Sequence, residues 1–261
     1  MELDLILENL ELSIGFELDE IAEDNSLENI GGACERIAHE YRSLAICKLL
    51  ADADTDAFYH NLIRSGQIRF YYLSRCHREN RVQDSLLVAS LIASFFDAVT
   101  ANQFRLAIEM SRLSSRQWSP DDEYEDDFCY ARFLYQYVAP ELDRDDDLEG
   151  ILSRFQLALE GKQNARWNVC KSLLAVDQAM FNEAYQQLID ERTEQIEEEE
   201  DSALGEEMTF LTEKHIFVEG LAILKIAERV GLQTEAEYLY CPAIARLPMT
   251  TPFPNDGYPR I

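Results

Sequence analysis

The sequence predicts an all-α protein, and three observations support that fold class. First, no proline precedes Pro120, and the glycines of that region are few: Gly15, Gly31, Gly32 and Gly66. Second, Ala, Leu, Ile, Arg, Glu and Phe dominate the same region, so little there would break a helix. Third, the alternation of apolar and polar residues that is typical of strands is scarce. With 261 residues, 47% of them hydrophobic, the chain is long enough to bury a real core.

We expect a single domain over residues 1–261, arranged as a helical bundle or an irregular helical array. With boundary errors of roughly 2–4 residues, the ten predicted helices span about 27–50, 54–64, 66–79, 83–99, 102–114, 125–138, 146–160, 164–175, 178–199 and 206–230. Ser26 and Asp177 are suited to cap helix N-termini, and Gly231 lies where a glycine would end the last helix. Residues 1–25 are expected to form an acidic N-terminal segment outside these helices.

Three acidic stretches separate the later helices and are expected to be loops or helix ends in water: 119–127, 139–150 and 196–207. The acids of the first stretch would also suit a helix N-terminus, where the helix dipole favours negative charge. From Pro242 onward the chain holds five of its seven prolines, so residues 242–261 are expected to form an extended tail. Phe253 and Tyr258 could pack this tail on the body, and a loose tail is the alternative.

The last predicted helix contains the stretch "HIFVEGLAILKIAERVGL" (215–232), which raises the question of a site. Its apolar residues recur at steps of three and four, which indicates a buried face: Phe217, Leu221, Leu224 and Ala227. Glu219 and Gly220 interrupt this face. A catalytic acid, a metal ligand and a plain solvent-facing residue are all compatible with Glu219, and Gly220 would permit a close helix crossing.

Arginine outnumbers lysine by 18 to 5, and guanidinium groups suit half-buried pairing with carboxylates. If Glu219 turns inward it needs such a partner, because an unpaired buried carboxylate is too costly. The candidates are Arg132, Arg154 and Arg166.

The net charge of −27 is distributed unevenly. Residues 1–35 carry 11 acids and no Lys or Arg, residues 36–116 carry 11 bases and 8 acids, and residues 117–261 carry 12 bases and 31 acids. Such a field repels nucleic acids and membrane phosphates and speeds the encounter with basic proteins. The alternative is that the acidity only keeps the protein soluble.

The compartment is inferred from the cysteines and from the absence of targeting signals. No C-x-x-C pair occurs among the six cysteines, so buried free thiols in a reducing compartment are expected. The N-terminal segment is acidic and unlike a secretory signal. The longest apolar runs, such as 85–96, are far shorter than the roughly 20 residues of a membrane span. We therefore expect a cytoplasmic protein.

A metal site is poorly supported. Two His–carboxylate pairs have i,i+4 spacing, Glu35 with His39 and His215 with Glu219. A di-iron helical bundle instead requires two Glu-x-x-His motifs and two further acids. We expect neither a metal nor a cofactor, and these histidines are interpreted as surface or half-buried residues.

Catalytic motifs are also missing. The sequence has no Gly-x-Ser-x-Gly elbow, no P-loop and no Gly-x-Gly-x-x-Gly motif. Cys76 and His77 are adjacent, but neighbours on a helix point about 100° apart and form no dyad. We expect no catalytic residue and no enzyme.

Residues 64–81 hold five arginines and three consecutive aromatics, a combination that can grip single-stranded nucleic acid. The flanking chain is strongly acidic, however, and part of the aromatic face must be core. Internal pairing of these arginines with the surplus acids is therefore favoured over nucleic-acid binding.

Three stretches in the C-terminal half occur in the order of a known family: "ARWNVCKSLLAVDQAMFNEAYQQLIDER" (165–192), "FVEGLAILKIAERVGL" (217–232) and "EYLYCPAIAR" (237–246). Arg166, Asp177 and Phe181 hold the places of an Arg…Leu-Leu…Asp-x-x-x-Phe helix pair. The second stretch, with Glu219 and Gly220, is similar to a Val-Glu-Gly-Leu-Ala signature. Together they resemble the bacterial immunity protein 49 family, found beside polymorphic toxin genes.

The resemblance implies an antitoxin-like protein that binds a cognate secreted toxin, such as a nuclease. An acidic protein would be steered onto the basic surface of such a toxin and could occlude it. The candidate contact residues are acids, with solvated loops as the alternative: Asp121, Asp122, Glu123, Glu125, Asp126 and Asp127; Asp145, Asp146 and Asp147; and Glu197, Glu198, Glu199, Glu200 and Asp201. The family residues Arg166, Asp177, Phe181, Glu219 and Gly220 are interpreted as structural. An acidic helical adaptor, scaffold or chaperone for a basic protein is the rival function, and self-association is left open.

Overall fold

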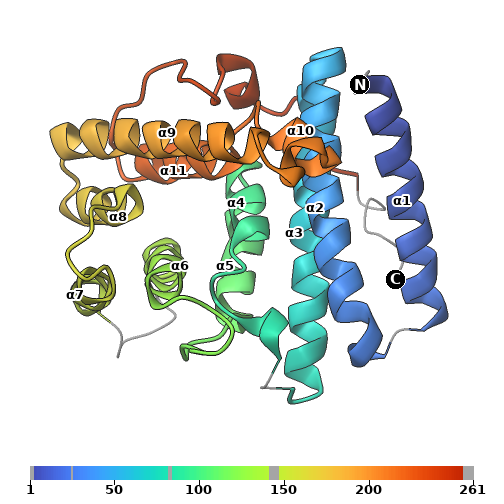
Figure 1. Cartoon of the computed structure of the whole chain (residues 1–261), viewed down its shortest axis with the longest axis horizontal. Helices are drawn as coiled ribbons and strands as arrows, with labels where there is room; N and C mark the ends of the chain where they lie inside the picture. The colour runs from blue at the N-terminus through green and yellow to red at the C-terminus, as the bar shows by residue number, and fades with distance from the viewer. Residues whose placement is uncertain (1–2, 25, 82–83, 141–146, 255–261) are drawn as a thin grey trace.

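The computed structural model describes residues 3–24, 26–81, 84–140 and 147–254 (Figure 1). Within these residues the chain forms eleven α-helices, three short 3-10 helices and no strand, which confirms the all-α prediction. The α-helices are α1 (Leu3–Glu23), α2 (Leu27–Asp52), α3 (Thr55–Arg78), α4 (Ala93–Thr100), α5 (Phe104–Leu113), α6 (Glu125–Val138), α7 (Leu148–Ala158), α8 (Ala165–Ala175), α9 (Gln178–Glu200), α10 (Met208–Glu213) and α11 (Val218–Arg229). The 3-10 helices are η1 (Ser85–Leu87), η2 (Ala203–Glu206) and η3 (Ala243–Arg246).

The helices are arranged in two differently oriented groups (Figure 1). At one side α1, α2 and α3 run alongside one another, with α1 at the edge in contact with α2, and α2 against α3. At the other side α9 and α11 run crosswise to that group, and α8 lies against α9. Helices α4 and α5 join the groups, because α4 contacts both α3 and α11.

The apolar core follows the same division. A smaller cluster fills the space between the first three helices and includes Leu10, Ile37 and Tyr72. The larger cluster extends from α3 through α4 and α6 to α11, with Phe133 and Leu221 among its buried members. Residues 45 to 49 of α2 contribute to both clusters, so the two parts form one continuous domain.

The N-terminal segment is a helix, which the sequence interpretation did not include. Ile6, Leu10 and Ile14 of α1 recur every four residues and are buried, so they form the narrow apolar stripe of an amphipathic helix. The many acids of the segment occupy its remaining faces. The four-residue spacing of these apolar residues is present in the sequence and could have predicted the helix despite the many acids.

One uninterrupted helix, α3, replaces the two helices predicted at 54–64 and 66–79. Gly66 lies in its interior, where a Cβ would come within 2.9 Å of Leu106 Cδ2. The glycine therefore serves the close approach of α5 and does not end the helix. The break predicted at this glycine is wrong for that reason.

The helix predicted at 83–99 is also wrong in its first half, where η1 and a turn at residues 89–90 precede α4. Asp84 accepts hydrogen bonds from the Leu86 backbone (2.9 Å) and from the Tyr72 hydroxyl (2.8 Å). The backbone N–H of Ser90 donates to Glu123 at 2.9 Å. These side chains satisfy the backbone of the segment in place of helical hydrogen bonds.

The helix predicted at 206–230 is divided into η2, α10 and α11. Between α10 and α11 the backbone N–H of Phe217 donates to the carbonyl of Tyr240 at 2.8 Å. The C-terminal segment thus takes up a donor that a continuous helix would need. Helix α11 begins only at Val218, so His215 lies outside it.

The other six predicted helices agree with the structure to within two residues at each end. Asp177 caps α9 as expected, since its side chain accepts from the Met180 backbone at 2.9 Å. Ser26 occupies the N-cap position of α2 but makes no side-chain capping bond. Gly231 follows α11 with φ of +92°, which confirms the predicted glycine at its end.

The C-terminal segment up to residue 254 runs back across α3. The Tyr59 hydroxyl donates to the carbonyl oxygens of Ala245 (3.0 Å) and Leu247 (2.6 Å). Phe253 packs edge-on against His60 at 5.5 Å between ring centroids, as the sequence interpretation allowed. Tyr258, the other expected anchor, lies outside the described residues. The described part of the tail is therefore attached to the body.

Candidate functional site

The family-signature residue Glu219 lies in the first turn of α11, with its carboxylate turned inward and its side chain 10% exposed. Arg166 of α8 donates to it through two parallel bonds, from Nε to Oε1 at 2.9 Å and from Nη2 to Oε2 at 2.8 Å. The Tyr130 hydroxyl of α6 donates to Oε1 at 2.8 Å. This planar, two-bond geometry is the strongest form of a carboxylate–arginine pair. Of the three arginines considered from the sequence, Arg166 is the partner.

The electrostatics of this network stabilise the ionised carboxylate. Burial by itself would raise the pKa of Glu219, but Arg166 and the Tyr130 hydroxyl hold that pKa below its usual range. Burial and the nearby Glu219 charge raise the pKa of Tyr130 well above 10. The carboxylate is thus ionised at neutral pH, and both of its oxygens accept hydrogen bonds. Such a group joins helices and is unsuited to act as a general acid.

Further contacts tie the same arginine to the body. Arg166 lies over the Tyr130 ring at 5.0 Å from its centroid and pairs with Asp127 of α6 at 3.3 Å. Beside it, a Cβ on Gly220 would come within 2.9 Å of Cys241 Sγ and 3.0 Å of the Tyr185 hydroxyl. The glycine therefore permits a close approach, as expected. The elements that approach it are α9 and also the C-terminal segment, which is not a crossing helix.

Asp177 and Phe181, the remaining signature residues, hold the start of α9. The side chain of Asp177 caps the helix, and Phe181 is fully buried and stacks on Tyr185 with 5.7 Å between ring centroids. Arg166, Glu219, Gly220 and Phe181 thus lie where α6, α8, α9 and α11 meet. Asp177 caps the start of α9.

A cleft of about 240 Å³ opens beside this network, between α4, α9, α10 and α11, and contains the arginines Arg42, Arg166 and Arg192. Arg42 forms two bonds with the buried Asp97, at 2.8 and 3.0 Å. Arg192 donates to the carbonyl of Glu213 at 3.0 Å. Each of the three guanidinium groups is thus engaged in holding neighbouring elements together.

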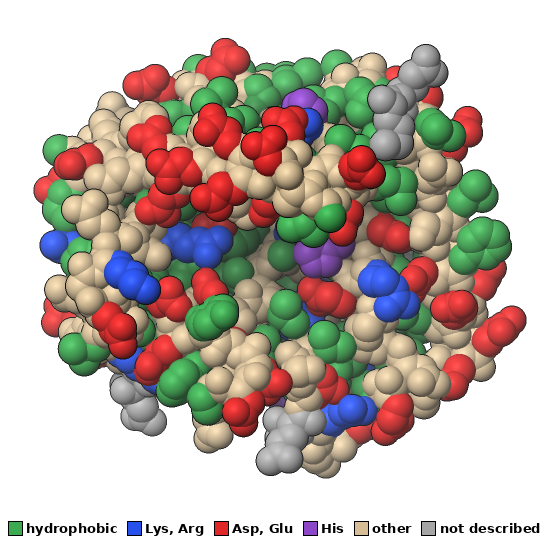
Figure 2. Space-filling model, in the orientation of Figure 1, with side chains coloured by type: hydrophobic (Ala, Val, Ile, Leu, Met, Phe, Trp, Pro, Cys, Tyr) green, Lys and Arg blue, Asp and Glu red, His purple; other side chains and the backbone are tan. Residues whose placement is uncertain are grey.

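The exposed face of α9 carries many acidic side chains. We use "acidic ridge" for its exposed acids other than Glu200, which pairs with Lys214, together with the residue that follows the helix: Glu183, Asp190, Glu191, Glu194, Glu197, Glu198 and Asp201. Figure 2 shows acidic side chains gathered over the position of α9, above a hollow in the same face. Three residues of the predicted patch at 197–201, Glu197, Glu198 and Asp201, belong to the ridge. The ridge therefore presents negative charge to water.

The rest of that sequence patch is engaged within the chain. Glu200 pairs with Lys214 at 2.8 Å, and Glu199 accepts a bond from Gln195 at 2.7 Å. Sequence reasoning missed the N-terminal part of the ridge, from Glu183 to Glu194. The signal was present, since Glu183, Asp190 and Glu194 lie seven and four residues apart and so share a helix face.

The predicted patch at 121–127 is divided between exposed and internal roles. Asp121 and Asp122 are exposed in a loop, and Asp126 is half-buried. The remaining three are used inside the molecule: Glu123 accepts from Ser90 and Ser119, Glu125 pairs with Arg154 at 2.7 Å, and Asp127 pairs with Arg166 at 3.3 Å. The structure brings these six acids together only in part.

The third predicted patch begins outside the described residues, where Asp145 and Asp146 lie. Asp147 is exposed and caps α7 by accepting from the Gly150 backbone. That bond gives Asp147 a structural role at the start of the helix.

The two His–carboxylate pairs considered for metal binding do not form a common site. Glu35 lies 3.4 Å from His39 and also pairs with Arg69, while Glu219 is engaged by Arg166 and His215 is exposed. Among the described residues, no group of three or more His, Cys, Asp or Glu side chains is arranged to hold a metal ion. All six cysteines are buried free thiols, as predicted.

The arginine-rich segment at 64–81 pairs internally. Arg69 contacts Glu35 at 3.3 Å, Arg75 contacts Glu79 at 2.9 Å, and Arg81 contacts Asp84 at 2.9 Å. These pairs support the internal-pairing interpretation of the segment. Over the part of the chain that is described, no helix has the length and apolarity needed to cross a membrane.

Comparison with known proteins gives one match. A family model described as Immunity protein 49 matches residues 65–245, from the interior of α3 to η3. No curated protein and no solved structure matches the chain. The matched region contains all five signature residues and the acidic ridge, and it leaves out α1 and α2.

Proposed function

The chain belongs to the immunity protein 49 family, and from that premise we propose that it binds a cognate secreted bacterial toxin and neutralises it by occlusion. The partner we propose is a toxin with a basic surface, such as a nuclease, met in the cytoplasm. In this proposal the protein contributes a binding surface and performs no catalysis of its own.

The observation that carries the proposed mechanism is the acidic ridge on α9. Between Gln178 and Asp201 the chain has nine acids and one base, Arg192, and that base points its guanidinium toward the carbonyl of Glu213. Three of the ridge acids, Glu194, Glu197 and Glu198, make no ion pair among the described residues. Unpaired charge of one sign over a helix face raises the local concentration of a basic partner and speeds its association.

The buried network supports a rigid binding body. Glu219 joins α11 to α8 and α6, and Arg42 joins α2 to α4 through Asp97. A preorganised surface loses little conformational entropy on binding. We therefore propose that these buried ion pairs keep the helices that carry the binding surface in fixed positions.

The proposed function is tested by protection of cells. The toxin domain encoded beside this gene is expressed in a bacterium with and without this protein, and survival is counted. We expect survival with this protein and loss of viability without it. The control replaces it with another acidic helical protein of similar net charge. Equal survival with the control, or death despite expression of this protein, would reject the proposal.

An adaptor, scaffold or chaperone for a basic protein is the rival function. It would use the same acidic ridge, since charge attracts basic proteins of many kinds. The identity of the neighbouring gene separates the two. A gene for a secreted protein with a toxin domain supports immunity, whereas a gene for a basic structural or nucleic-acid-binding protein supports the rival.

A further inference from the structure

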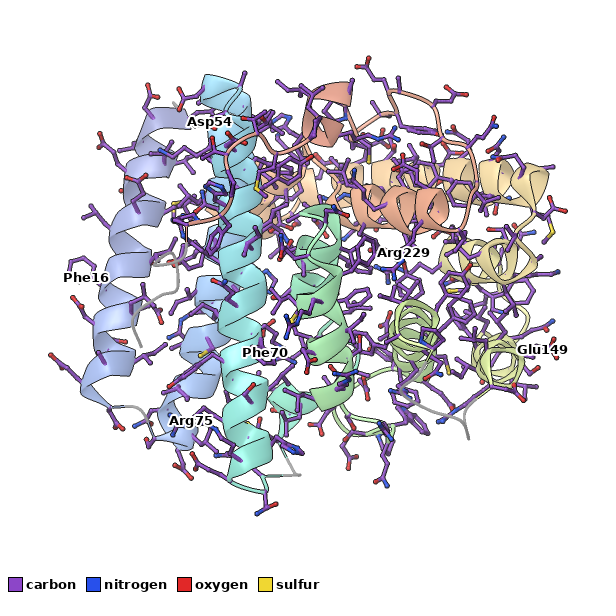
Figure 3. The ribbon with its side chains drawn as sticks, turned by 180° about the vertical axis from the view of Figure 1, so that it is seen from behind. Phe16, Asp54, Phe70, Arg75, Glu149 and Arg229 are labelled. Carbon is purple, nitrogen blue, oxygen red and sulfur yellow. The ribbon has the colours of Figure 1, made fainter. Side chains whose placement is uncertain are left out.

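The outward face of α1 carries an exposed apolar stripe that nothing described so far uses. Leu5, Leu12 and Phe16 are 51%, 61% and 69% exposed. They lie seven and four residues apart and therefore share one face of the helix. Figure 3 shows Phe16 pointing away from the body of the molecule. Single exposed apolar residues are ordinary, but an aligned set ending in an aromatic is the pattern of a binding surface.

The exposure of this stripe results from how firmly α1 is attached on its other side. Ile6, Leu10, Ile14 and Ile21 are buried against the neighbouring helices. Glu17 forms two bonds with Arg36 of α2, at 2.6 and 2.8 Å, and Lys48 lies 3.1 Å from Glu11. The helix is thus fixed in orientation, and the stripe lies on the side opposite to the buried residues.

Carboxylates border the stripe on both sides. Glu8 lies between the first two apolar residues along the helix, and Asp19 and Glu20 lie one turn beyond Phe16. All three are exposed and make no ion pair among the described residues. The sequence has no Lys or Arg before Arg36. Apolar anchors enclosed by a charged rim are the typical composition of a protein–protein contact.

We propose that this face of α1 is the surface on which the toxin docks, through an apolar groove bordered by Lys and Arg side chains. The inference rests on the proposed function and names the surface that it uses. An amphipathic helix binds such a groove through anchors at these spacings. The carboxylates of the rim would meet the basic border of the groove, while the acidic ridge on α9 acts at longer range during approach.

Charge disfavours a second copy of this chain as the occupant. Two copies meeting through α1 would bring Glu8, Asp19 and Glu20 of each against the same residues of the other, and like charges in contact oppose association. The family match begins at residue 65, so α1 lies outside the shared region.

The test compares two variants that keep the net charge. Leu12→Gln combined with Phe16→Gln removes two anchors of the stripe, and Leu157→Gln removes an apolar side chain on α7 that is 79% exposed. The probe is the purified, catalytically inactivated toxin domain encoded beside this gene. We expect the stripe variant to dissociate roughly 30-fold faster or more, the Leu157 variant to match the wild type, and all three proteins to melt at the same temperature.

Wild-type rates for the stripe variant, with wild-type protection of cells, would overturn this inference and leave the proposed function standing. Failure of the wild-type protein to bind the toxin domain or to protect cells would reject the proposed function and this inference with it. Sedimentation of the free protein gives a further readout. A wild-type dimer that the stripe variant converts to monomer would show a self-contact and overturn the proposal.

Discussion

At the residue scale, the hydrogen bonds of the Glu219 carboxylate decide whether this residue has a structural or a catalytic role. Glu219 interrupts an apolar run, a position where a reactive acid could sit. The two bonds donated by Arg166 and the third donated by Tyr130 hold it in its ionised form. Removing the carboxylate would leave the partly buried Arg166 charge with only its longer pair to Asp127, at 3.3 Å, and loss of the main partner of a buried charge is costly.

Glu219→Ala is expected to lower the free energy of unfolding by about 2–3 kcal/mol. The lower end of that range reflects the Arg166 side chain, which is 38% exposed and so partly solvated. Urea unfolding of the purified variant measures the loss. Glu109→Ala is the control, because its pair with Arg112 is at the surface and should contribute no more than about 0.5 kcal/mol. Full stability of the Glu219 variant with loss of toxin binding would show that this residue belongs to the contact.

At the element scale, the space around a helical glycine shows whether a neighbouring segment packs closely against the helix at that point. Gly220 in α11 faces Cys241 and Tyr185, so a Cβ there has no room. Gly15 in α1 has no atom of another element within 4 Å of a Cβ. The same substitution should therefore have opposite effects at the two positions.

Gly220→Ala is expected to destabilise the protein by about 1–2 kcal/mol, because overpacking outweighs the better helix propensity of alanine. Gly15→Ala is expected to stabilise it by about 0.5–1 kcal/mol, since only the propensity changes. Thermal unfolding of both variants beside the wild type measures the difference. Shifts of the same sign would contradict the assignment of close contact at Gly220.

The sequence was sufficient for elements whose ends are set locally and insufficient where distant residues set them. Asp177 and Gly231 marked the ends of α9 and α11 because capping depends on neighbouring residues. The interruption before α11 depends on Tyr240, more than twenty residues further along the chain. In the same way, the sequence narrowed the partner of Glu219 to three arginines, and only the folded structure, in which Arg166 of α8 reaches Glu219 of α11, selects Arg166.

At the scale of the whole molecule, the charged residues fall into two groups: those in ion pairs inside the body and those exposed at the surface. Many arginines are used internally, as in the pairs of Arg42 with Asp97 and Arg166 with Glu219. The acids in excess remain at the surface, on the acidic ridge and on α1. A net charge of −27 arranged in this way gives a strongly negative exterior on a body held together by internal ion pairs.

Neutralising part of the acidic ridge should slow association with the toxin domain. The variant Glu194→Gln, Glu197→Gln, Glu198→Gln is expected to associate roughly threefold to tenfold more slowly at low salt, with a small change in dissociation. The control, Asp52→Asn, Glu149→Gln, Glu237→Gln, removes the same charge from scattered exposed positions and should lose less than about twofold. Stopped-flow rates across a salt series measure both. Rates that are independent of ionic strength would reject steering.

We propose that this protein neutralises its toxin by occluding it, and a titration of toxin activity is the sharpest test of that mechanism. Increasing amounts of the purified protein are added to a fixed amount of the toxin domain encoded beside its gene. The account predicts that activity falls linearly to zero at about one equivalent, as expected for tight binding, and returns when the complex is dissociated. Permanent loss of toxin activity at a small fraction of one equivalent would indicate catalysis, and undiminished activity at an excess would show that no occluding complex forms; either result would contradict the account.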